Sequence, residues 1–533
     1  MTDSDRPTED DLARGERLAR ALRDPAAYPD PAPVEHLETH ISHVFLTGEH
    51  AYKIKKPVNL GFLDFTTLAR RKHFCEEEVR INRRLAPELY LAVVPVAGSP
   101  DAPRVEGPGT PIEYAVKMRR FPHEDVLDRV ADAGGLRPAH VDEIARQLAA
   151  FHAIADDVPP NAQFGSPARI REAAAANFAP VRPLLGTEAA VRLATVQDWT
   201  EREGTRLASL MTKRREQGRV RECHGDLHLG NIALLDGRIV LFDALEFDQA
   251  LRWTDVMNEV AFLAMDLRAH ARPDLAARFV DAWCSHSGDY AGLALLRYYE
   301  VYRALVRAKV VALRVAQLPA DAGERRALTA RCEALAALAD VLHRPVTPAL
   351  VLLHGVSGSG KTWGSQHMLE ATGAVRIRSD VERKRLTGVP PEIGSPSSLD
   401  SGLYAEDITA LTYERLATLA RDILRAGFPV LVDATFLRKD RREAFVRVAR
   451  EEGVPAHIVS FVAPGEVLRA RVRTRQAAAN DASDATLDIL EQQLRRREPL
   501  SDVEQTIAIE FDTSVMSDAD VARRAREMLC TQT

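Results

Sequence analysis

A chain of 533 residues is too long for a single hydrophobic core, and its length corresponds to about three or four structural units. A hydrophobic content of 46% with 28% charged residues is typical of a soluble globular protein. The formal net charge of -6 gives no reason to expect general affinity for nucleic acid or for membrane surfaces.

The sequence also lacks the signals that direct a chain out of the cytoplasm. Its opening, MTDSDRPTEDDLARGERLAR, is acidic and polar, so we expect no signal peptide. No apolar run approaches the ~20 residues of a membrane span. The five cysteines show no C-x-x-C spacing, which argues against a zinc site or a disulfide framework. We therefore expect a cytoplasmic protein with reduced thiols.

The first predicted elements are a short helix and a pair of strands. A Pro-rich piece, DPAAYPDPAP, predicts that the opening helix is followed by an extended lead-in. In the segment ISHVFLTGEHAYKIKK, apolar and polar residues then alternate, which predicts two strands around a turn at residues 47–50. Strand alternation places Lys53 and Lys55 on one face of the sheet.

A helix expected over roughly residues 67–85 carries Glu78 on an otherwise apolar stripe. Because an isolated carboxylate is costly to bury, Glu78 needs a cationic partner. Either Lys53 or Lys55, on the preceding strand, can provide it. A further strand over residues 112–121 completes the first lobe. The C-terminal end of this strand is expected to be a hinge between two lobes.

The most informative stretch of the first half is CHGDLHLGNIALLDGRIVLFDALEF, residues 223–247. Its two apolar runs are joined by an Asp-Gly pair, a strong signal for a two-residue hairpin turn. A turn centred there places Asn231 opposite Phe242 and beside Asp243. Asp226 lies on the loop that enters the hairpin. An Asp, an Asn and a second Asp brought together in this way suit a proton acceptor and two Mg²⁺ ligands.

HGDLHLGN, with its D-x-x-x-x-N spacing, resembles the catalytic loop of the aminoglycoside and choline phosphotransferases, which are relatives of the protein kinases. The resemblance covers roughly residues 35–320 and implies a bilobal, protein-kinase-like fold that uses ATP and Mg²⁺. It implies that Asp226 is the catalytic base and that Asn231 and Asp243 are metal ligands. His224 would then brace the loop.

The same resemblance assigns roles in the first lobe. Lys53, in AYK, best matches the lysine that positions the α and β phosphates of ATP, and Lys55 is the alternative. Glu78 matches the helix glutamate that pairs with this lysine. The chain departs from the protein kinases because it has no Gly-x-Gly-x-x-Gly loop. A short turn at residues 40–43 stands in its place, as in other small-molecule kinases of this group.

An independent phosphate-binding motif lies in the last third of the chain. The apolar run 349–354 is followed by GVSGSGKT, which matches G-x-x-x-x-G-K-[ST] at every fixed position. Backbone N–H groups of such a loop reach the phosphates of ATP, and the N-terminus of the following helix adds a favourable dipole. The expected cradle consists of Gly355, Val356, Ser357, Gly358, Ser359, Gly360, Lys361 and Thr362. Lys361 should reach the β and γ phosphates, and Thr362 should bind Mg²⁺.

Four more apolar runs interleaved with helices follow the glycine loop, and they predict a doubly wound, three-layer α/β domain. AVRIRSD is expected to end a strand at Asp380, and FPVLVDATF another at Asp433. Parallel strands present their carboxyl ends to the ligand crevice, so both carboxylates should face the nucleotide. The fold class expected for the whole chain is therefore multidomain, α/β and α+β.

The order GSGKT, S-D-x-x-R, DATF and R-x-x-x-R resembles the P-loop kinases of the polynucleotide kinase, gluconokinase and zeta-toxin group over residues 348–515. It implies that Asp380 accepts the proton of the substrate hydroxyl and that Arg383 orients the substrate or Asp380. Arg471 and Arg475, which share a helix face, would be lid arginines. Asp433 would contact either substrate or metal.

The chain as a whole resembles a bacterial family described as aminoglycoside phosphotransferase and ATPase fusions. The expected parts are a lead-in (1–34), a kinase-like N-lobe (35–121), a helical C-lobe with the catalytic loop (122–342), a linker (343–348) and a P-loop kinase domain (349–533). The leading hypothesis is a bifunctional kinase in which each half transfers the γ-phosphate of ATP to a small-molecule hydroxyl.

Two other functions stay open from the sequence. In the first, one half is degenerate and senses ATP in order to regulate the other. In the second, the C-terminal half is a polynucleotide 5′-hydroxyl kinase, although the acidic net charge argues against binding nucleic acid.

Overall fold

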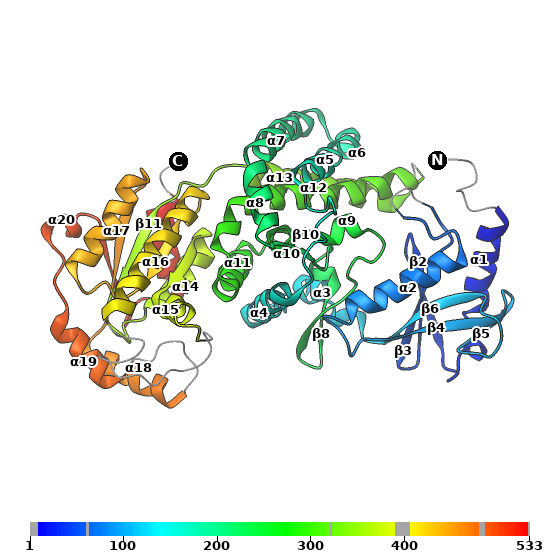
Figure 1. Ribbon diagram of the computed structural model, residues 1–533, viewed down its shortest axis with the longest axis horizontal. Helices are drawn as coiled ribbons and strands as arrows, with labels where there is room; N and C mark the ends of the chain where they lie inside the picture. The colour runs from blue at the N-terminus through cyan, green and yellow to red at the C-terminus, as the bar shows by residue number, and fades with distance from the viewer. Residues whose placement is uncertain (1–8, 60–62, 320–321, 390–405, 479–485, 531–533) are drawn as a thin grey trace. The chain divides into compact units, whose positions relative to one another are not determined.

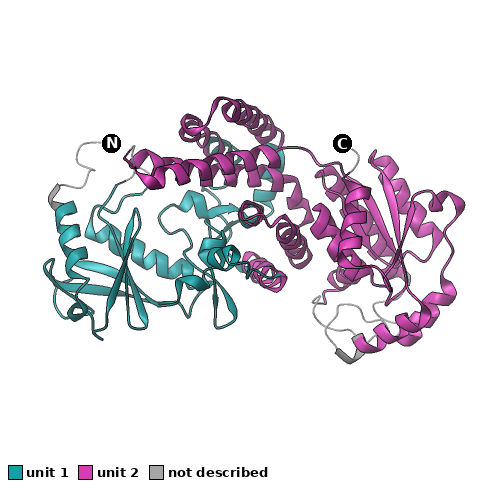
Figure 2. Cartoon of the chain, turned by 180° about the vertical axis from the view of Figure 1, so that it is seen from behind, with its two compact units in different colours: residues 1–137, 154–172, 208–263 teal, residues 138–153, 173–207, 264–533 magenta. Residues whose placement is uncertain are grey.

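The computed structural model describes residues 9–59, 63–319, 322–389, 406–478 and 486–530 (Figure 1). The chain divides into two compact units (Figure 2). Unit 1 comprises residues 1–137, 154–172 and 208–263, and unit 2 comprises residues 138–153, 173–207 and 264–533. Within the described ranges, no helix is both long enough and apolar enough to cross a membrane.

Unit 1 is built on a six-stranded antiparallel sheet with the order β1-β2-β3-β6-β4-β5. Leu18 of α1 clusters with Ile54 on one face of this sheet, and Val79 of α2 clusters with Val116 on the other. The strands are β1 (Val34–Glu38), β2 (Ser42–Thr47), β3 (His50–Lys55), β4 (Tyr90–Ser99), β5 (Ala102–Val105) and β6 (Glu113–Arg119), and the covering helices are α1 (Glu9–Ala21) and α2 (Leu68–Asn82).

The two strands expected in ISHVFLTGEHAYKIKK are confirmed as β2 and β3. Their register pairs Val44 with Lys53 and closes at Thr47 and His50. Side chains alternate along β3, so Ile54 packs towards α1 while both lysines reach α2. One helix can therefore receive two cations from the same strand.

A second, smaller group of strands in unit 1 carries the HGDLHLGN loop. The hairpin register runs from Ile232–Leu241 to Leu235–Arg238, which confirms the turn at Asp-Gly. The two turn residues have φ of 51° and 75°, as a two-residue hairpin requires. The remaining elements of unit 1 are α3 (Leu127–Asp132), α8 (Ala208–Glu216), β7 (Val220–Glu222), β8 (Ile232–Leu235), β9 (Arg238–Leu241), α9 (Gln249–Arg252) and β10 (Trp253–Asp255).

Helices make up the first part of unit 2. Three helices, α4 (Pro138–Ile154), α5 (Pro167–Ala175) and α10 (Val256–Ala269), have residues in both units. The others before the second sheet are α6 (Phe178–Val181), α7 (Thr187–Arg206), α11 (Pro273–Ser287), α12 (Leu293–Gln317) and α13 (Gly323–Leu342).

The second sheet has five parallel strands in the order β12-β13-β11-β14-β15. Helices α14 and α21 pack on one face and α16 and α17 on the other, which gives the expected three layers. The strands are β11 (Leu350–His354), β12 (Val375–Arg378), β13 (Val430–Asp433), β14 (Ala456–Val462) and β15 (Ala508–Asp512). The helices are α14 (Lys361–Thr372), α15 (Ser379–Leu386), α16 (Glu406–Arg425), α17 (Lys439–Glu451), α18 (Gly465–Ala478), α19 (Leu487–Arg496), α20 (Asp502–Gln505) and α21 (Asp518–Leu529).

One strand end differs from the expectation. Strand β12 stops at Arg378, and Asp380 lies in the first turn of α15. Arg378 keeps extended backbone, and an acid in a first helical turn is favoured by the helix dipole. Asp433, in contrast, is the last residue of β13, as expected.

Candidate active sites

The centre of unit 1 is an ion cluster between β3, α2 and the residues that follow the hairpin. Lys53 Nζ lies 2.8 Å from Glu78 Oε1 and 2.7 Å from Asp243 Oδ1. Burial disfavours the charge on Lys53, but Asp243 and Glu78 outweigh it and raise the pKa of the ammonium well above its usual range. The structure thus brings together three of the residues singled out from the sequence.

Lys55 occupies a different environment from Lys53. Its side chain is fully buried, and its Nζ contacts Glu246 and lies 2.8 Å from Glu78 Oε2. Burial opposes ionisation of Glu78, yet the two lysines lower its pKa to about 2. Since Lys53 is 13% exposed and contacts Asp243, it is the lysine that faces the hairpin end. Glu246 has no sequence motif that could have identified it.

The turn after the hairpin is held in a rare backbone conformation. Asp243 has a φ of 59°, in the left-handed region that few residues other than glycine, Asn and Asp adopt. The Asp243 N–H donates to the Tyr90 hydroxyl at 3.0 Å. The next N–H, of Ala244, donates to Asn82 Oδ1 at 2.8 Å. Tyr90 and Asn82 therefore fix the backbone that carries Asp243, although sequence reasoning missed both.

Asp226 and Asn231 meet across the HGDLHLGN loop. Asn231 Nδ2 donates to the Asp226 carbonyl at 2.9 Å and to Asp226 Oδ2 at 3.2 Å. The Phe242 N–H donates to the Asn231 carbonyl at 3.0 Å, which confirms that these two residues face each other. The side chain of Asp226 is 36% exposed, so its carboxylate is accessible from solvent.

His224 and Glu259 hold this loop in place through hydrogen bonds. Burial lowers the pKa of His224, so the ring is neutral at physiological pH. Its Nε2 lies 2.8 Å from the Phe242 carbonyl, and that acceptor assigns the proton to Nε2. The Gly225 N–H, at a φ of 87°, donates to Glu259 Oε1 at 2.8 Å. Both contacts tie the loop to neighbouring elements.

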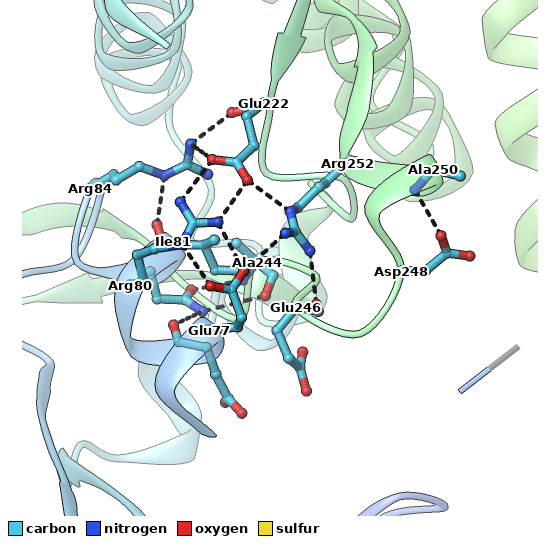
Figure 3. Close-up of polar contacts among 12 residues, drawn as sticks. Glu77, Arg80, Ile81, Arg84, Glu222, Ala244, Glu246, Asp248, Ala250 and Arg252 are labelled. Carbon is cyan, nitrogen blue, oxygen red and sulfur yellow. Dashed lines mark hydrogen bonds and ion pairs between the residues drawn. The ribbon is translucent and has the colours of Figure 1, made fainter. Parts of the chain in front are cut away.

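An ion network centred on the buried side chains of Glu222 and Arg252 joins α2 to the start of the same loop (Figure 3). Glu222 is the last residue of β7. Its carboxylate accepts hydrogen bonds from the guanidinium groups of Arg80 at 2.7 Å, Arg84 at 2.9 Å and Arg252 at 3.0 Å. Arg80 and Arg252 also bond to Glu77. The helix that carries Glu78 is thereby fixed to the strand that leads into Asp226.

Unit 2 holds the second candidate site, at the glycine loop. Gly358 and Gly360 have φ of 79° and 88°. A Cβ at Gly358 would lie 2.9 Å from the Leu468 carbonyl oxygen, and one at Gly360 would lie 3.0 Å from Thr513. The loop therefore needs glycine at both positions, which keeps its backbone open for a phosphate group.

Lys361 begins α14 and lies over this loop. Its Nζ donates to the carbonyl groups of Gly355 at 2.7 Å and of Val356 at 3.0 Å. Thr362 follows it and is exposed. The Ser357 N–H donates to Gln493 Oε1 of α19 at 2.8 Å, a contact that the sequence did not indicate.

Two acids, Asp380 and Asp433, were expected near the glycine loop. Each of them lies beside an arginine. Arg383 Nη1 lies 3.3 Å from Asp380 Oδ1. Arg378 Nε lies 4.0 Å from Asp433 Oδ2, and these two residues are paired across β12 and β13. The two acids thus lie at the same edge of the sheet.

Of the two expected lid arginines, Arg471 reaches the glycine loop. It donates to the Gly358 carbonyl at 3.3 Å and to Thr513 Oγ1 at 2.7 Å. Arg475 lies within the bounds of α18, but its side chain is outside the described part of the chain.

Two protein-family models match the chain. A phosphotransferase enzyme family matches residues 62–296, which include Glu78, Asp226 and Asp243. A model described as an AAA domain matches residues 350–500, which include the glycine loop. The two matches correspond to the two candidate sites.

Curated relatives span both parts. An uncharacterized protein of Mycobacterium tuberculosis is 32% identical over 457 residues, which are 85% of this chain and 88% of the relative. An uncharacterized protein of Mycobacterium bovis matches to the same extent.

Several solved structures are similar to part of the chain. Amicoumacin kinase hAmiN is 13% identical and covers 61% of this chain and 96% of its own, with a TM-score of 0.38. A sugar kinase from Janibacter sp. is 21% identical and covers 35% and 96%, with a TM-score of 0.27. A gluconokinase from Sinorhizobium meliloti is 24% identical and covers 35% and 94%, with a TM-score of 0.24.

The family models confirm the expected fold class and show that the chain is a kinase with an ATP-binding P-loop. Both halves of the expected fusion are matched in the expected order. The chain therefore belongs to the bacterial family that joins an aminoglycoside phosphotransferase-like domain to a P-loop kinase domain.

Proposed function

We propose that the protein is a bifunctional kinase in which each half transfers the γ-phosphate of ATP to a hydroxyl of a small-molecule acceptor. The observation that supports the proposal is that each unit combines a lysine held by neighbouring protein groups with an acid that has a polar partner, and we assign the lysine to phosphate and the acid to the acceptor. In unit 1 these are Lys53 and Asp226, and in unit 2 they are Lys361 and Asp380.

The residues of unit 1 fit ATP and Mg²⁺ by the chemistry of their donors. Asp226, Asn231 and Asp243 offer the carboxylate and amide oxygens that Mg²⁺ prefers. When bound, ATP supplies the phosphoryl group, and Mg²⁺ neutralises its charge. Lys53, held by Glu78, binds the α and β phosphates, and Asn231 and Asp243 hold the metal.

Asp226 accepts the proton of the acceptor hydroxyl in this scheme. Its carboxylate is exposed to an acceptor, and the Asn231 amide holds one of its oxygens in place at 3.2 Å. His224 keeps the loop in shape without a charge of its own. Positioning and electrostatics are the main contributions that a kinase makes to phosphoryl transfer.

The glycine loop of unit 2 is assigned to a phosphate chain because Gly358 and Gly360 have left-handed backbone, where a Cβ would collide with Leu468 and Thr513. Lys361 binds the β and γ phosphates after leaving its loop carbonyls, and Thr362 holds Mg²⁺. The cradle-forming residues are Gly355, Val356, Ser357, Gly358, Ser359 and Gly360. Asp380 is the proposed base for the second acceptor.

The remaining residues of unit 2 are assigned to the acceptor and the lid. Arg383 orients Asp380, which it contacts, or the acceptor itself. Asp433 contacts the acceptor at the same sheet edge. Arg471 and Arg475 are the proposed lid arginines that clamp the transferring phosphate.

The proposal is tested by phosphorylating a small-metabolite extract with γ-labelled ATP. The Asp226→Asn and Asp380→Asn variants should each lose a part of the labelled products that the wild-type protein forms. Asp101→Asn, which changes an exposed acid, should retain all of them. Loss of no product in either variant, with ATP binding intact, would overturn the assignment of both bases and support an ATP-sensing regulator instead.

The same assay separates the polynucleotide kinase alternative. An oligonucleotide with a free 5′-hydroxyl is added in place of the extract. Labelling that is lost in Asp380→Asn would replace the small-molecule acceptor of unit 2 by a nucleic acid. We expect no such labelling.

A further inference from the structure

Two helices that lie far from the glycine loop in sequence, α18 and α19, pack against it. Val356 of the loop forms an apolar cluster with Val472 of α18 and Leu490 of α19. Arg471 of α18 donates to the Gly358 carbonyl at 3.3 Å. The loop is therefore held by side chains outside its own motif.

Gln493 of α19 adds a polar contact with the same loop. The Ser357 N–H donates to Gln493 Oε1 at 2.8 Å. A backbone N–H can only donate, so the amide of Gln493 turns its oxygen towards the loop. Ser357 is buried and Gln493 is half-buried, so the bond lies within the packed contact between α19 and the loop.

The proposed function assigns the Ser357 N–H to ATP, because Ser357 belongs to the cradle whose N–H groups would bind the phosphates. An N–H group offers a single hydrogen, so a well-aligned bond to a phosphate oxygen excludes the bond to Gln493. A phosphate oxygen carries charge, and charge-assisted hydrogen bonds are stronger than neutral ones. The phosphate is therefore the stronger of two acceptors for one donor.

Lys361 makes an internal contact of the same kind. Its Nζ donates to the carbonyl groups of Gly355 at 2.7 Å and of Val356 at 3.0 Å. In the proposed function it exchanges these carbonyls for the β and γ phosphates. A backbone donor and the lysine thus each exchange a protein acceptor for a phosphate oxygen.

We propose that Gln493 competes with ATP for the Ser357 N–H and thereby sets the affinity of the glycine loop for the nucleotide, an inference that rests on the proposed ATP site of unit 2. Displacement of the amide needs only a rotation of the Gln493 side chain, because the apolar contacts of Val356 hold α18 and α19 beside the loop. Binding of ATP thus breaks one hydrogen bond between the loop and α19.

The test is a calorimetric titration of the full-length protein with a non-hydrolysable ATP analogue and Mg²⁺. Binding at the glycine loop is the component that Lys361→Ala removes. Gln493→Ala should bind the analogue at this site about fivefold more tightly, the effect of removing one competing neutral hydrogen bond. Gln493→Glu should weaken the same binding about tenfold, because its carboxylate accepts the N–H more strongly and repels the phosphates.

Gln492→Ala is the matched control, because Gln492 is the neighbouring glutamine of α19, is also half-buried and points about 100° away around the helix. It should leave the affinity unchanged. A general loss of packing weakens binding, so a tighter complex in Gln493→Ala cannot arise from damage to the fold.

Equal or weaker binding of the analogue in Gln493→Ala than in wild type would overturn the proposal. Gln493→Glu is nearly isosteric with the wild type and stays informative if the alanine variant fails to fold, and an unchanged affinity in it would also overturn the proposal. If Lys361→Ala removes no binding from the wild-type titration, the ATP site of unit 2 fails together with the role of Gln493.

Discussion

At the scale of single residues, the two lysines of β3 show how neighbouring residues of one type take different roles. Both pair with Glu78, but only Lys53 also contacts Asp243 at the hairpin end. Lys55 is enclosed between Glu78 and Glu246 with no exposed surface. Lys53 is therefore expected to serve catalysis, and Lys55 to serve stability.

Substitution of each lysine by methionine tests this division. Lys55→Met leaves Glu246 as an uncompensated buried carboxylate, so we expect a loss of about 3–5 kcal/mol in the free energy of unfolding, measured with urea. Lys53→Met should lower the turnover of the first half on the order of a hundredfold, because a phosphate contact is lost, with a smaller loss of stability. The opposite ranking of the two variants would contradict the assignment.

At the scale of elements, α2 makes ionic contacts with the segment that leads into the HGDLHLGN loop. Glu222 is the residue on which three arginines converge. Burial disfavours its charge, but Arg80, Arg84 and Arg252 outweigh it and lower the pKa of Glu222 to about 2. The ionised form therefore stabilises the folded state.

This pKa shift predicts a pH dependence of stability. The stabilisation is complete above the ordinary pKa of 4.5 and is lost as the pH falls towards 2. Glu222→Gln should lower the free energy of unfolding by about 3 kcal/mol at pH 7, and the difference from wild type should shrink as the pH falls below 4.5. Glu88→Gln, an exposed partner of Arg238, should cost little at any pH. A Glu222→Gln effect that grows on acidification would contradict the network.

The glycine loop gives a second prediction at this scale. Gly358→Ala places a Cβ against the Leu468 carbonyl at a φ of 79°, so the loop must move and the activity of the second half should be lost. Gly373→Ala carries a similar backbone cost at a φ of 71° but meets nothing within 4 Å. It should retain activity. Equal activity of the two variants, measured with the products of the second half, would show that the cradle tolerates a side chain.

Sequence reasoning predicted local features correctly but missed contacts between residues that lie far apart along the chain. The hairpin register followed from its local Asp-Gly turn, and the alternation of β3 placed both lysines correctly. Tyr90 and Gln493 were missed because they bond to residues 153 and 136 positions away through a backbone N–H, which leaves no motif. Asp380 was placed on a strand end because a four-residue strand and a first helical turn look alike in sequence.

At the scale of the whole molecule, the proposed function gives the chain two different sites for one kind of chemistry. One would hold phosphates with a strand lysine and an oxygen-rich hairpin end, and the other with a glycine loop and a helix N-terminus. Family models cover both sites, and the mycobacterial relatives span both. Fusion of two such units predicts two independent phosphorylation reactions in one protein.

The most direct measurement is a comparison of phosphorylated products, separated by chromatography, from wild type, Asp226→Ala and Lys361→Ala in one metabolite extract. We expect two sets of products, one lost in Asp226→Ala and the other lost in Lys361→Ala, with no product lost in both. A single set of products that disappears in only one variant would contradict the claim of two kinases, and so would one set that disappears in both.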